Sequence, residues 1–342
     1  MTQLGEPLEI IDGIRLPQLK KGQLLVKVHY AGVCHSQLKE ARGERGEDPY
    51  VPHMLGHEGT GSVLSVGKGV DKVSVGDSVV LGWIKGKGLD AMGTEYVGPK
   101  GEIINAGAVT TFSRHTIVSE NRVVKLPPNT PMDLAVLYGC ALPTGAGIVF
   151  NEINIKASST IVIFGLGGIG LSALVAAKTY EPAMLVGIDI ESSKLELGKQ
   201  LGATHVINAN DTDAIQAVLE LTGTIGADFV VEASGLANII EQGFQMTRRN
   251  GGQLVFATHP KAGDMIKLDP FELICGKLIR GSWGGGSKPD TDIPKMDLLY
   301  KDGKLPLEAF VSHTYSLDDI NIALSDLEQR KIVRALIDMG RD

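Results

Sequence analysis

The stretch from Ile161 to Asp189 reads IVIFGLGGIGLSALVAAKTYEPAMLVGID. It begins with four consecutive apolar residues, Ile161 to Phe164, which is typical of a strand buried on both faces of a parallel sheet. The alanine-rich segment from Leu171 to Tyr180 has the composition of a helix. A second apolar run, Met184 to Ile188, ends in the acid Asp189. This order predicts a βαβ unit.

Glycines stand between this strand and helix at Gly165, Gly167 and Gly170. The spacing G-x-G-x-x-G places a dinucleotide pyrophosphate at a helix N-terminus, where free N–H groups and the helix dipole favour an anion. We expect the tight turn at Gly165, close phosphate approach at Gly167 and close helix packing at Gly170, so the turn with Gly168 and Ile169 is the predicted cofactor loop. Because the chain has 43 glycines, a plain glycine turn is the alternative for the motif alone.

Asp189 indicates which dinucleotide this turn would bind. It follows Gly170 by 19 residues (189 − 170), close to the spacing of about 20 residues expected for an acid that hydrogen-bonds a ribose 2′-OH. A carboxylate there would repel a 2′-phosphate. The sequence therefore favours NAD over NADP.

The overall composition limits the classes of protein that remain. A length of 342 residues suits two domains, and no run of 18 uninterrupted apolar residues could span a membrane. The N-terminus MTQLGEPLEI lacks the features of a signal peptide, so we expect a cytoplasmic protein. The net charge of −7 and the lack of a basic cluster argue against nucleic acid as a partner. Three cysteines are too few for a disulfide framework and are read as thiols or metal ligands.

The first part of the chain, residues 1–145, is predicted to be mostly β. Its short apolar runs lie between glycine-rich turns and indicate a barrel-like or partly open antiparallel domain. The expected strands are Leu24 to Val28, Gly61 to Val66, Asp77 to Leu81, Thr116 to Val118 and Val123 to Leu126. The segment from Gly82 to Val109 shows little periodicity and is expected to be a long surface excursion.

Residues 146–284 alternate between strand and helix patterns, as in a doubly wound parallel sheet. After the first strand we expect strands at Met184 to Ile188, 206–207, Phe229 to Glu232 and Gln253 to Phe256, and helices at Ser192 to Leu201, Asp211 to Thr222 and Leu236 to Thr247. Residues 285–342 return to the first domain through a helix near Ile293 to Lys301 and a strand within Ile332 to Asp338. The nucleotide domain is thus predicted to be inserted in the other domain.

A candidate metal site is formed by three residues that precede the nucleotide motif in the chain. They are Cys34 in AGVCHSQ, His57 in MLGHEGTG and Cys140 in YGCALPTGAG. A Cys, His, Cys set that leaves one position open suits a catalytic zinc, which acts as a Lewis acid on a carbonyl or an alcohol. The three residues are far apart in sequence. Taken singly, two small buried thiols and a hydrogen-bonded core histidine explain them equally well.

The motifs GVCHS, GHEGTG, YGCALPTGAG and FGLGGIG, in this order, resemble those of the zinc-dependent alcohol dehydrogenases of the medium-chain dehydrogenase/reductase superfamily. The resemblance covers essentially the whole chain. It implies an α/β fold in which a Rossmann domain is inserted in a GroES-like, mostly β catalytic domain. It also implies one zinc ion on Cys34, His57 and Cys140, with Glu58 beside the metal assisting ligand exchange.

The resemblance assigns further roles residue by residue. Ser36 matches the hydroxyl that takes the proton from the alcohol, and Trp83 falls where the family places an aromatic wall of the substrate pocket. The remaining matches concern the dinucleotide: Thr144 near the nicotinamide, Asp189 and Lys194 at the adenosine ribose, and His35 and Arg334 at the pyrophosphate. For Lys194 and Arg334 alone, a solvated surface cation is the alternative, and for Trp83 a core position.

The chain departs from the family pattern at three places. It has no cysteine between Cys34 and Cys140, so the structural zinc site of many relatives is expected to be absent. Gln37 replaces a frequent carboxylate, which predicts lower zinc affinity because an amide donates less electron density to the ligand histidine. Lys39 replaces a common relay histidine and is a poor proton acceptor at neutral pH, so we expect the relay to end at the nicotinamide ribose and water.

The sequence thus predicts a zinc-dependent enzyme that transfers a hydride between a primary or secondary alcohol and NAD, with the cleft between its domains positioning donor and acceptor. One alternative is a zinc-free quinone or enone reductase on the same fold. The other is a non-catalytic nucleotide-binding protein, which only Gln37 and Lys39 favour. The expected partners are a small alcohol, aldehyde or ketone and a second copy of the chain, as a homodimer or homotetramer.

Overall fold

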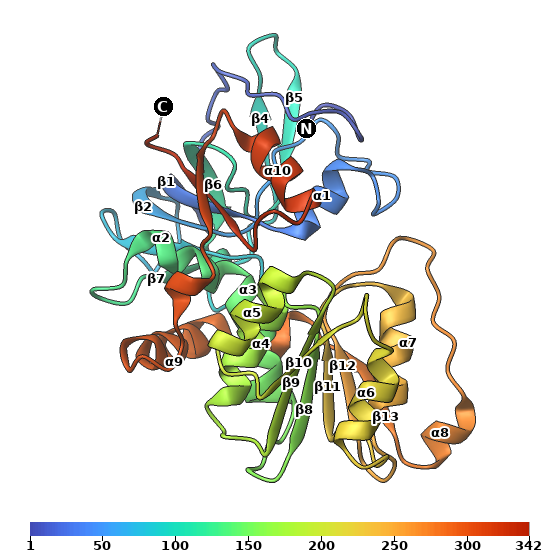
Figure 1. The fold of residues 1–342 in the computed structure, drawn as a ribbon. Helices are drawn as coiled ribbons and strands as arrows, with labels where there is room; N and C mark the ends of the chain where they lie inside the picture. Colours follow the sequence, from blue (N-terminus) through green and yellow to red (C-terminus); the bar gives the residue numbers. More distant parts are fainter. Residues whose placement is uncertain (342) are drawn as a thin grey trace. The chain divides into compact units, whose positions relative to one another are not determined.

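The computed structural model describes residues 1–341. The chain divides into two compact units (Figure 1). The first unit holds residues 1–140, 288–298 and the segment from 307 onward, and the second holds residues 141–287 and 299–306. The segments near both ends of the chain therefore share one unit, while most of the second unit is one continuous stretch.

The second unit contains a six-stranded, wholly parallel sheet in the order β10-β9-β8-β11-β12-β13. Its strands are β8 Thr160–Phe164, β9 Met184–Asp189, β10 His205–Asn208, β11 Phe229–Glu232, β12 Gln253–Phe256 and β13 Leu278–Gly281. In chain order this is 3-2-1-4-5-6, the doubly wound Rossmann topology. The five predicted strands are confirmed, and β13 is an additional one.

Helices cover both faces of this sheet, α4 and α5 on one side and α6 and α7 on the other (Figure 1). The helices are α3 Ala141–Gly147, α4 Gly168–Lys178, α5 Ser192–Gln200, α6 Ala214–Leu221, α7 Ala237–Met246 and α8 Pro270–Ile274. A π-helical turn, Ile148–Glu152, follows α3, and a 3₁₀ turn occupies Gly284–Gly286. Val162 and Val230 of the sheet are fully buried against Val218 of α6 and Phe244 of α7. The sheet is apolar on both faces because both are covered.

The first unit is built on a seven-stranded sheet with the order β14-β15-β1-β2-β3-β7, in which β6 also pairs with β1. Its strands are β1 Gln23–Val33, β2 Gly59–Val66, β3 Ser78–Leu81, β6 His115–Ser119, β7 Val123–Lys125, β14 His313–Ser316 and β15 Ala335–Asp338. All these pairs are antiparallel except β14 with β15. The long strand β1 pairs with β2, β6 and β15, so the C-terminal strand returns to this sheet as predicted.

Short helices complete the first unit. They are α1 His35–Ala41, α2 Met132–Ala135 and α10 Ile320–Glu328, with 3₁₀ turns at Glu120–Arg122, Val136–Gly139 and Leu307–Ala309. Helix α9, Pro289–Lys301, begins in this unit and ends in the other. In the described chain no single helix is long and apolar enough to cross a membrane. One bent pair of helical segments, Met132–Gly139 and Ala141–Glu152, is long and apolar enough when the two are taken together, by length and composition only.

The expectation of an irregular surface excursion from Gly82 to Val109 is wrong in part. This segment contains a two-stranded antiparallel sheet, β4 Thr94–Val97 and β5 Ile103–Ala106. Tyr96 is 1% exposed and Ile104 5%, because alternate side chains of the hairpin pack with Ile117 of β6 in a small core. Neither TEYV nor IINA alternates strictly between apolar and polar residues, so the sequence lacks the pattern of a half-buried strand.

Candidate active site

The three candidate metal ligands come from separate places in the first unit. Cys34 follows the end of β1, His57 lies two residues before β2, and Cys140 follows the 3₁₀ turn at Val136–Gly139. Strands β1 and β2 pair with Ala31 opposite Gly59, which brings the end of one strand beside the start of the other. The Sγ and ring-nitrogen atoms of the three residues all lie within 4.8 Å of one another.

These donors fit a zinc ion chemically. Two thiols and one imidazole are the soft and borderline ligands that zinc prefers, and three protein ligands leave a fourth position for substrate. Because Cys140 donates a hydrogen bond to Cys34 and Arg334 lies nearby, the pKa of Cys34 is held well below that of an ordinary thiol. The same hydrogen bond, together with burial, raises the pKa of Cys140. The pair therefore already favours one thiolate, which is the form that binds a metal.

A buried ion pair lies beside the ligands. The guanidinium of Arg334, just before β15, donates a hydrogen bond to Oε1 of Glu58, which is fully buried. Burial raises the pKa of Glu58, and the negative charge of Cys34 adds to this, while Arg334 opposes it. Burial lowers the pKa of Arg334, but Glu58 and the two cysteines raise it further, so the net shift is upward. Arg334 is therefore a permanent cation next to the thiols.

Two glycines make room for Glu58. A methyl group at Gly32 would lie 2.6 Å from Oε1 of Glu58, and one at Gly139 would lie 2.7 Å from its Cβ. Both glycines come shortly before a cysteine ligand in the chain, in the segments GVC and GC. Sequence reasoning did not single them out, because the clash that excludes a side chain is with a residue distant in sequence.

Ser36, the predicted relay residue, lies at the metal site. Its Oγ donates a hydrogen bond to Sγ of Cys34 over 3.1 Å. It is half-buried in the first turn of α1, where His35 is exposed. Ser36 thus contacts one of the three candidate metal ligands directly.

Gln37 connects two of the metal-site residues. Its Oε1 accepts a hydrogen bond from the backbone N–H of Cys34 at 3.1 Å, and its Nε2 contacts Nδ1 of His57. The other ring nitrogen of His57, Nε2, lies 3.1 Å from Sγ of Cys140. His57 therefore presents Nε2 to the thiols and Nδ1 to the amide, and Gln37 orients the ring.

The glycine turn of the second unit has the predicted local geometry. Gly165 has φ +91°, in the left-handed region that favours glycine. A methyl group at Gly170 would lie 1.8 Å from the carbonyl oxygen of Gly165, so only glycine lets α4 approach β8 this closely. A methyl group at Gly167 would meet nothing within 4 Å, and Gly167 directly precedes the first residue of α4. The open N-terminus of an 11-residue helix is where a pyrophosphate would bind.

Asp189 lies at the end of β9, the strand adjacent to β8. Its Oδ2 accepts from the N–H of Leu166 at 2.7 Å, and its Oδ1 accepts from Ile190 and Glu191 at 2.8 and 3.0 Å. These bonds fix the carboxylate beside the glycine turn, and Oδ2, which accepts only one of them, keeps a lone pair that a ribose hydroxyl can use.

The other predicted residues are placed as follows. Lys194 is buried in the first turn of α5, as the third residue of that helix. Thr144 is buried in α3, and its Oγ1 has no hydrogen-bond partner in the described chain, as expected of a hydroxyl that meets a bound group. Trp83 is half-buried after β3, and its carbonyl accepts a hydrogen bond from Arg122.

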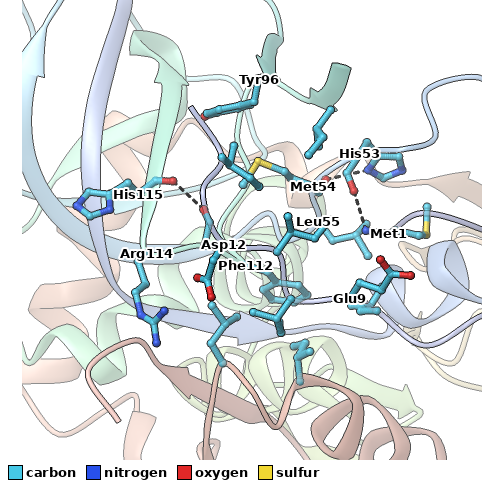
Figure 2. A pocket seen from close by; sticks show the side chains of 18 of the residues that line it. Met1, Glu9, Asp12, His53, Met54, Leu55, Tyr96, Phe112, Arg114 and His115 are labelled. Carbon is cyan, nitrogen blue, oxygen red and sulfur yellow. Dashed lines mark hydrogen bonds between the residues drawn. The ribbon is translucent and has the colours of Figure 1, made fainter. Parts of the chain in front are cut away.

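The first unit has two further polar or hollow features. Glu40, Asp48 and His53 form a polar cluster in which His53 Nε2 lies 2.7 Å from Asp48 Oδ2. A mostly apolar cavity of about 310 Å³ lies beside it. Figure 2 shows Leu55 and Phe112 in the lining of this cavity, and the carbonyl of His53 accepting a hydrogen bond from the Met1 amino group. Cys34, His57 and Cys140 are not among the described residues that line this cavity.

Each of the two units contains a region that matches a known protein family. Residues 20–128 match the alcohol dehydrogenase GroES-like domain, and residues 168–300 match the zinc-binding dehydrogenase family. S-(hydroxymethyl)glutathione dehydrogenase of Photobacterium damsela subsp. piscicida is 34% identical, over 97% of this chain and 96% of the relative. Among solved structures, an alcohol dehydrogenase zinc-binding domain protein from Burkholderia ambifaria has a TM-score of 0.90 at 29% identity, over 99% of this chain and 97% of that one. Benzyl alcohol dehydrogenase from Acinetobacter calcoaceticus has a TM-score of 0.86 at 30% identity, over 96% of this chain and 94% of that one.

A GroES-like domain, a Rossmann domain and a Cys, His, Cys centre together define a zinc-type oxidoreductase. Within this class, the chain belongs to the zinc-dependent alcohol dehydrogenase family of the medium-chain dehydrogenase/reductase superfamily. It is an NAD-dependent alcohol dehydrogenase, as the sequence predicted, and neither the zinc-free reductase nor the non-catalytic alternative is favoured.

Proposed function

We propose that this enzyme oxidises small primary or secondary alcohols to aldehydes or ketones, and reduces them in the reverse direction, at one catalytic zinc on Cys34, His57 and Cys140. The observation that carries the proposal is the convergence of these three side chains within 4.8 Å in a unit that also holds Ser36 and Glu58. A bound zinc ion supplies a Lewis acid that lowers the pKa of an alcohol.

The chain's own residues would then handle the proton. Ser36, hydrogen-bonded to Cys34 at 3.1 Å, is close enough to accept the alcohol proton and to pass one on, because a hydroxyl both donates and accepts. Arg334 keeps the Cys34 thiolate favoured, and its positive charge also pairs with the carboxylate of Glu58. Trp83 is the proposed aromatic wall of the substrate pocket.

NAD is the hydride carrier in this proposal. The pyrophosphate would bind the N–H groups from Gly167 to Ile169 at the start of α4, and Asp189 would hold the ribose. Lys194 and Thr144 would contribute to the ribose and nicotinamide ends. His35 and Arg334 are proposed to meet the pyrophosphate. Arg334 would have to do so while keeping its bond to Glu58.

We further propose one zinc per chain. The only cysteine besides the two ligands is Cys275, which is partly exposed in the second unit. The chain therefore has no set of four cysteines for a structural zinc.

The oligomer is proposed to be a dimer formed through the nucleotide domains. Strand β13 pairs only with β12, so its other edge is open within the described chain. Leu278 of β13 is 53% exposed, and two apolar side chains of the preceding helix α8 are exposed as well, Phe271 to 57% and Ile274 to 80%. An exposed apolar edge strand is a ready pairing surface.

We also propose a cytoplasmic location and domain limits at residues 145 and 284.

The test is zinc content by elemental analysis, measured together with NAD reduction against a panel of primary and secondary alcohols. We expect one zinc per chain, and we expect a Cys34→Ser variant to lose both metal and turnover. Cys275→Ser is the matched control and should keep both. A protein that binds NAD but neither retains zinc nor oxidises any alcohol would refute the proposal.

A further inference from the structure

The amide of Gln37 lies between the backbone N–H of Cys34, which is always a hydrogen-bond donor, and Nδ1 of His57, which would become a donor when Nε2 binds a metal. The N–H of Cys34 contacts Oε1 of the amide at 3.1 Å. Nδ1 of His57 contacts Nε2 of the amide. Gln37 is 1% exposed, so water does not supply an alternative partner for it.

In the arrangement observed, every member of this chain of contacts is satisfied. The amide oxygen accepts from Cys34, the amide NH₂ donates to Nδ1, and the ring proton of His57 then sits on Nε2. Nε2 lies 3.1 Å from Sγ of Cys140, to which it donates. This is a complete hydrogen-bond pattern for His57 with its proton on the nitrogen that faces the thiols.

A metal ion on the three ligands requires a different pattern. His57 must offer Nε2 without a proton, so a neutral ring carries its proton on Nδ1 and needs an acceptor there. Gln37 has a single oxygen, already used by Cys34, and reversing the amide would turn its NH₂ toward the Cys34 N–H. Either orientation leaves one buried donor facing another. A carboxylate would accept from both.

We propose that Gln37 is a positioning residue that stabilises the metal-free tautomer of His57, so that this enzyme holds zinc more weakly than it would with a carboxylate at position 37. This inference rests on the proposed zinc site. It gives a geometric reason for the lower affinity expected from the sequence, because the amide NH₂ favours the ring proton of His57 on Nε2, whereas a metal ion on Nε2 requires it on Nδ1. Zinc in this enzyme is then comparatively exchangeable.

The first experiment uses the unsubstituted protein without metal. Two-bond ¹H–¹⁵N spectra of ¹⁵N-histidine-labelled protein identify the tautomer of each ring, and a His57→Gln variant assigns the signals. We expect the proton of His57 on Nε2. A proton on Nδ1 would overturn the proposal, and no variant at position 37 has to fold for this result.

The second experiment titrates Zn²⁺ alone against a competing chelator. Gln37→Glu keeps the length of the side chain and provides two acceptors, so we expect its Kd for zinc to fall about tenfold, the lower end of the effect of residues that contact a metal ligand. Gln329→Glu adds the same charge at the surface beyond α10 and should leave the Kd unchanged.

The two readouts separate orientation from charge. In metal-free Gln37→Glu protein we expect the His57 proton to move to Nδ1. Tighter zinc binding without that change would mean that the added charge acts alone. An unchanged Kd would mean that the residue at position 37 does not affect zinc affinity. Both results would overturn the inference while leaving the proposed function intact, whereas unsubstituted protein that binds no zinc would refute the proposed function itself.

Discussion

Arg334 and Glu58 are 276 positions apart in the chain and form a buried ion pair beside the candidate metal ligands. Arg334 is 5% exposed and Glu58 is fully buried. A buried carboxylate without its cation is costly, so the pair is mutually dependent. It also joins the segment before the last strand of the first unit to the loop that carries His57.

The Arg334→Met variant should therefore lose stability. The change leaves Glu58 buried without a partner, and we expect the free energy of unfolding of the metal-free protein to fall by about 3–5 kcal/mol. Urea unfolding followed by circular dichroism measures this. Arg341→Met, at an exposed arginine, is the control and should change stability by less than about 0.5 kcal/mol. Equal losses in the two variants would show that the ion pair does not stabilise the unit.

Ser36→Ala should separate proton transfer from metal binding. Because Ser36 contacts Cys34 without being a ligand, we expect zinc content to stay the same while kcat falls by about 10²–10⁴-fold. Ser36→Thr restores a hydroxyl and should recover most of the activity. The proposed relay would be contradicted by a Ser36→Ala variant with unchanged kcat.

Two glycines of the nucleotide turn should respond differently to alanine. At Gly170 the added methyl meets the Gly165 oxygen, so we expect Gly170→Ala to destabilise the protein by about 1–3 kcal/mol even though alanine favours a helix. At Gly167 the space is open, and Gly167→Ala should cost less than about 1 kcal/mol in stability. Its methyl would instead occupy the place of the pyrophosphate and weaken NAD binding about tenfold, or ~1.4 kcal/mol.

Thermal unfolding and NAD titration by fluorescence measure these two effects. If Gly167→Ala binds NAD as well as the parent protein, the pyrophosphate does not approach the backbone there. If Gly170→Ala is as stable as the parent, the helix does not pack against Gly165 as described.

Tyr315 should make stability depend on pH in alkaline solution. Burial, together with the hydrogen bond that its hydroxyl donates to Asp326 at 2.9 Å, raises the pKa of Tyr315 to about 12. An unfolded tyrosine ionises at about pH 10. The contribution of Tyr315 is therefore complete below about pH 10 and is lost as the pH rises toward 12, because the unfolded chain releases the proton first.

Unfolding free energies measured from pH 9 to about pH 12 test this for the parent, Tyr315→Phe and Asp326→Asn. The decline should be shallower in both variants, since one has no phenol and the other lacks the carboxylate that raises its pKa. Parallel curves for all three proteins would show that Tyr315 does not contribute to the pH dependence.

Much of the nucleotide domain could be predicted from sequence because its signals are local. The strands from Ile161, Met184 and Phe229 are continuous apolar runs, as expected where both faces of a sheet are covered. Gly165 adopts a positive φ, and a side chain at Gly170 would clash with the carbonyl oxygen of Gly165. Both reasons for glycine therefore arise within the same turn. Strand β13 was missed because Leu278 lies at an exposed sheet edge, where the apolar run is not continuous.

The sequence by itself determined the Rossmann unit, the order of the domains and the residue types of the metal site, since each follows from short spacings or from motifs in a fixed order. Only the tertiary structure decided that Cys34, His57 and Cys140 converge, that Arg334 pairs with Glu58, and that the amide of Gln37 contacts both the Cys34 N–H and Nδ1 of His57. These relationships depend on the register in which β1 pairs with β2 and β15. That register is set by burying side chains from distant segments together, which no local spacing encodes.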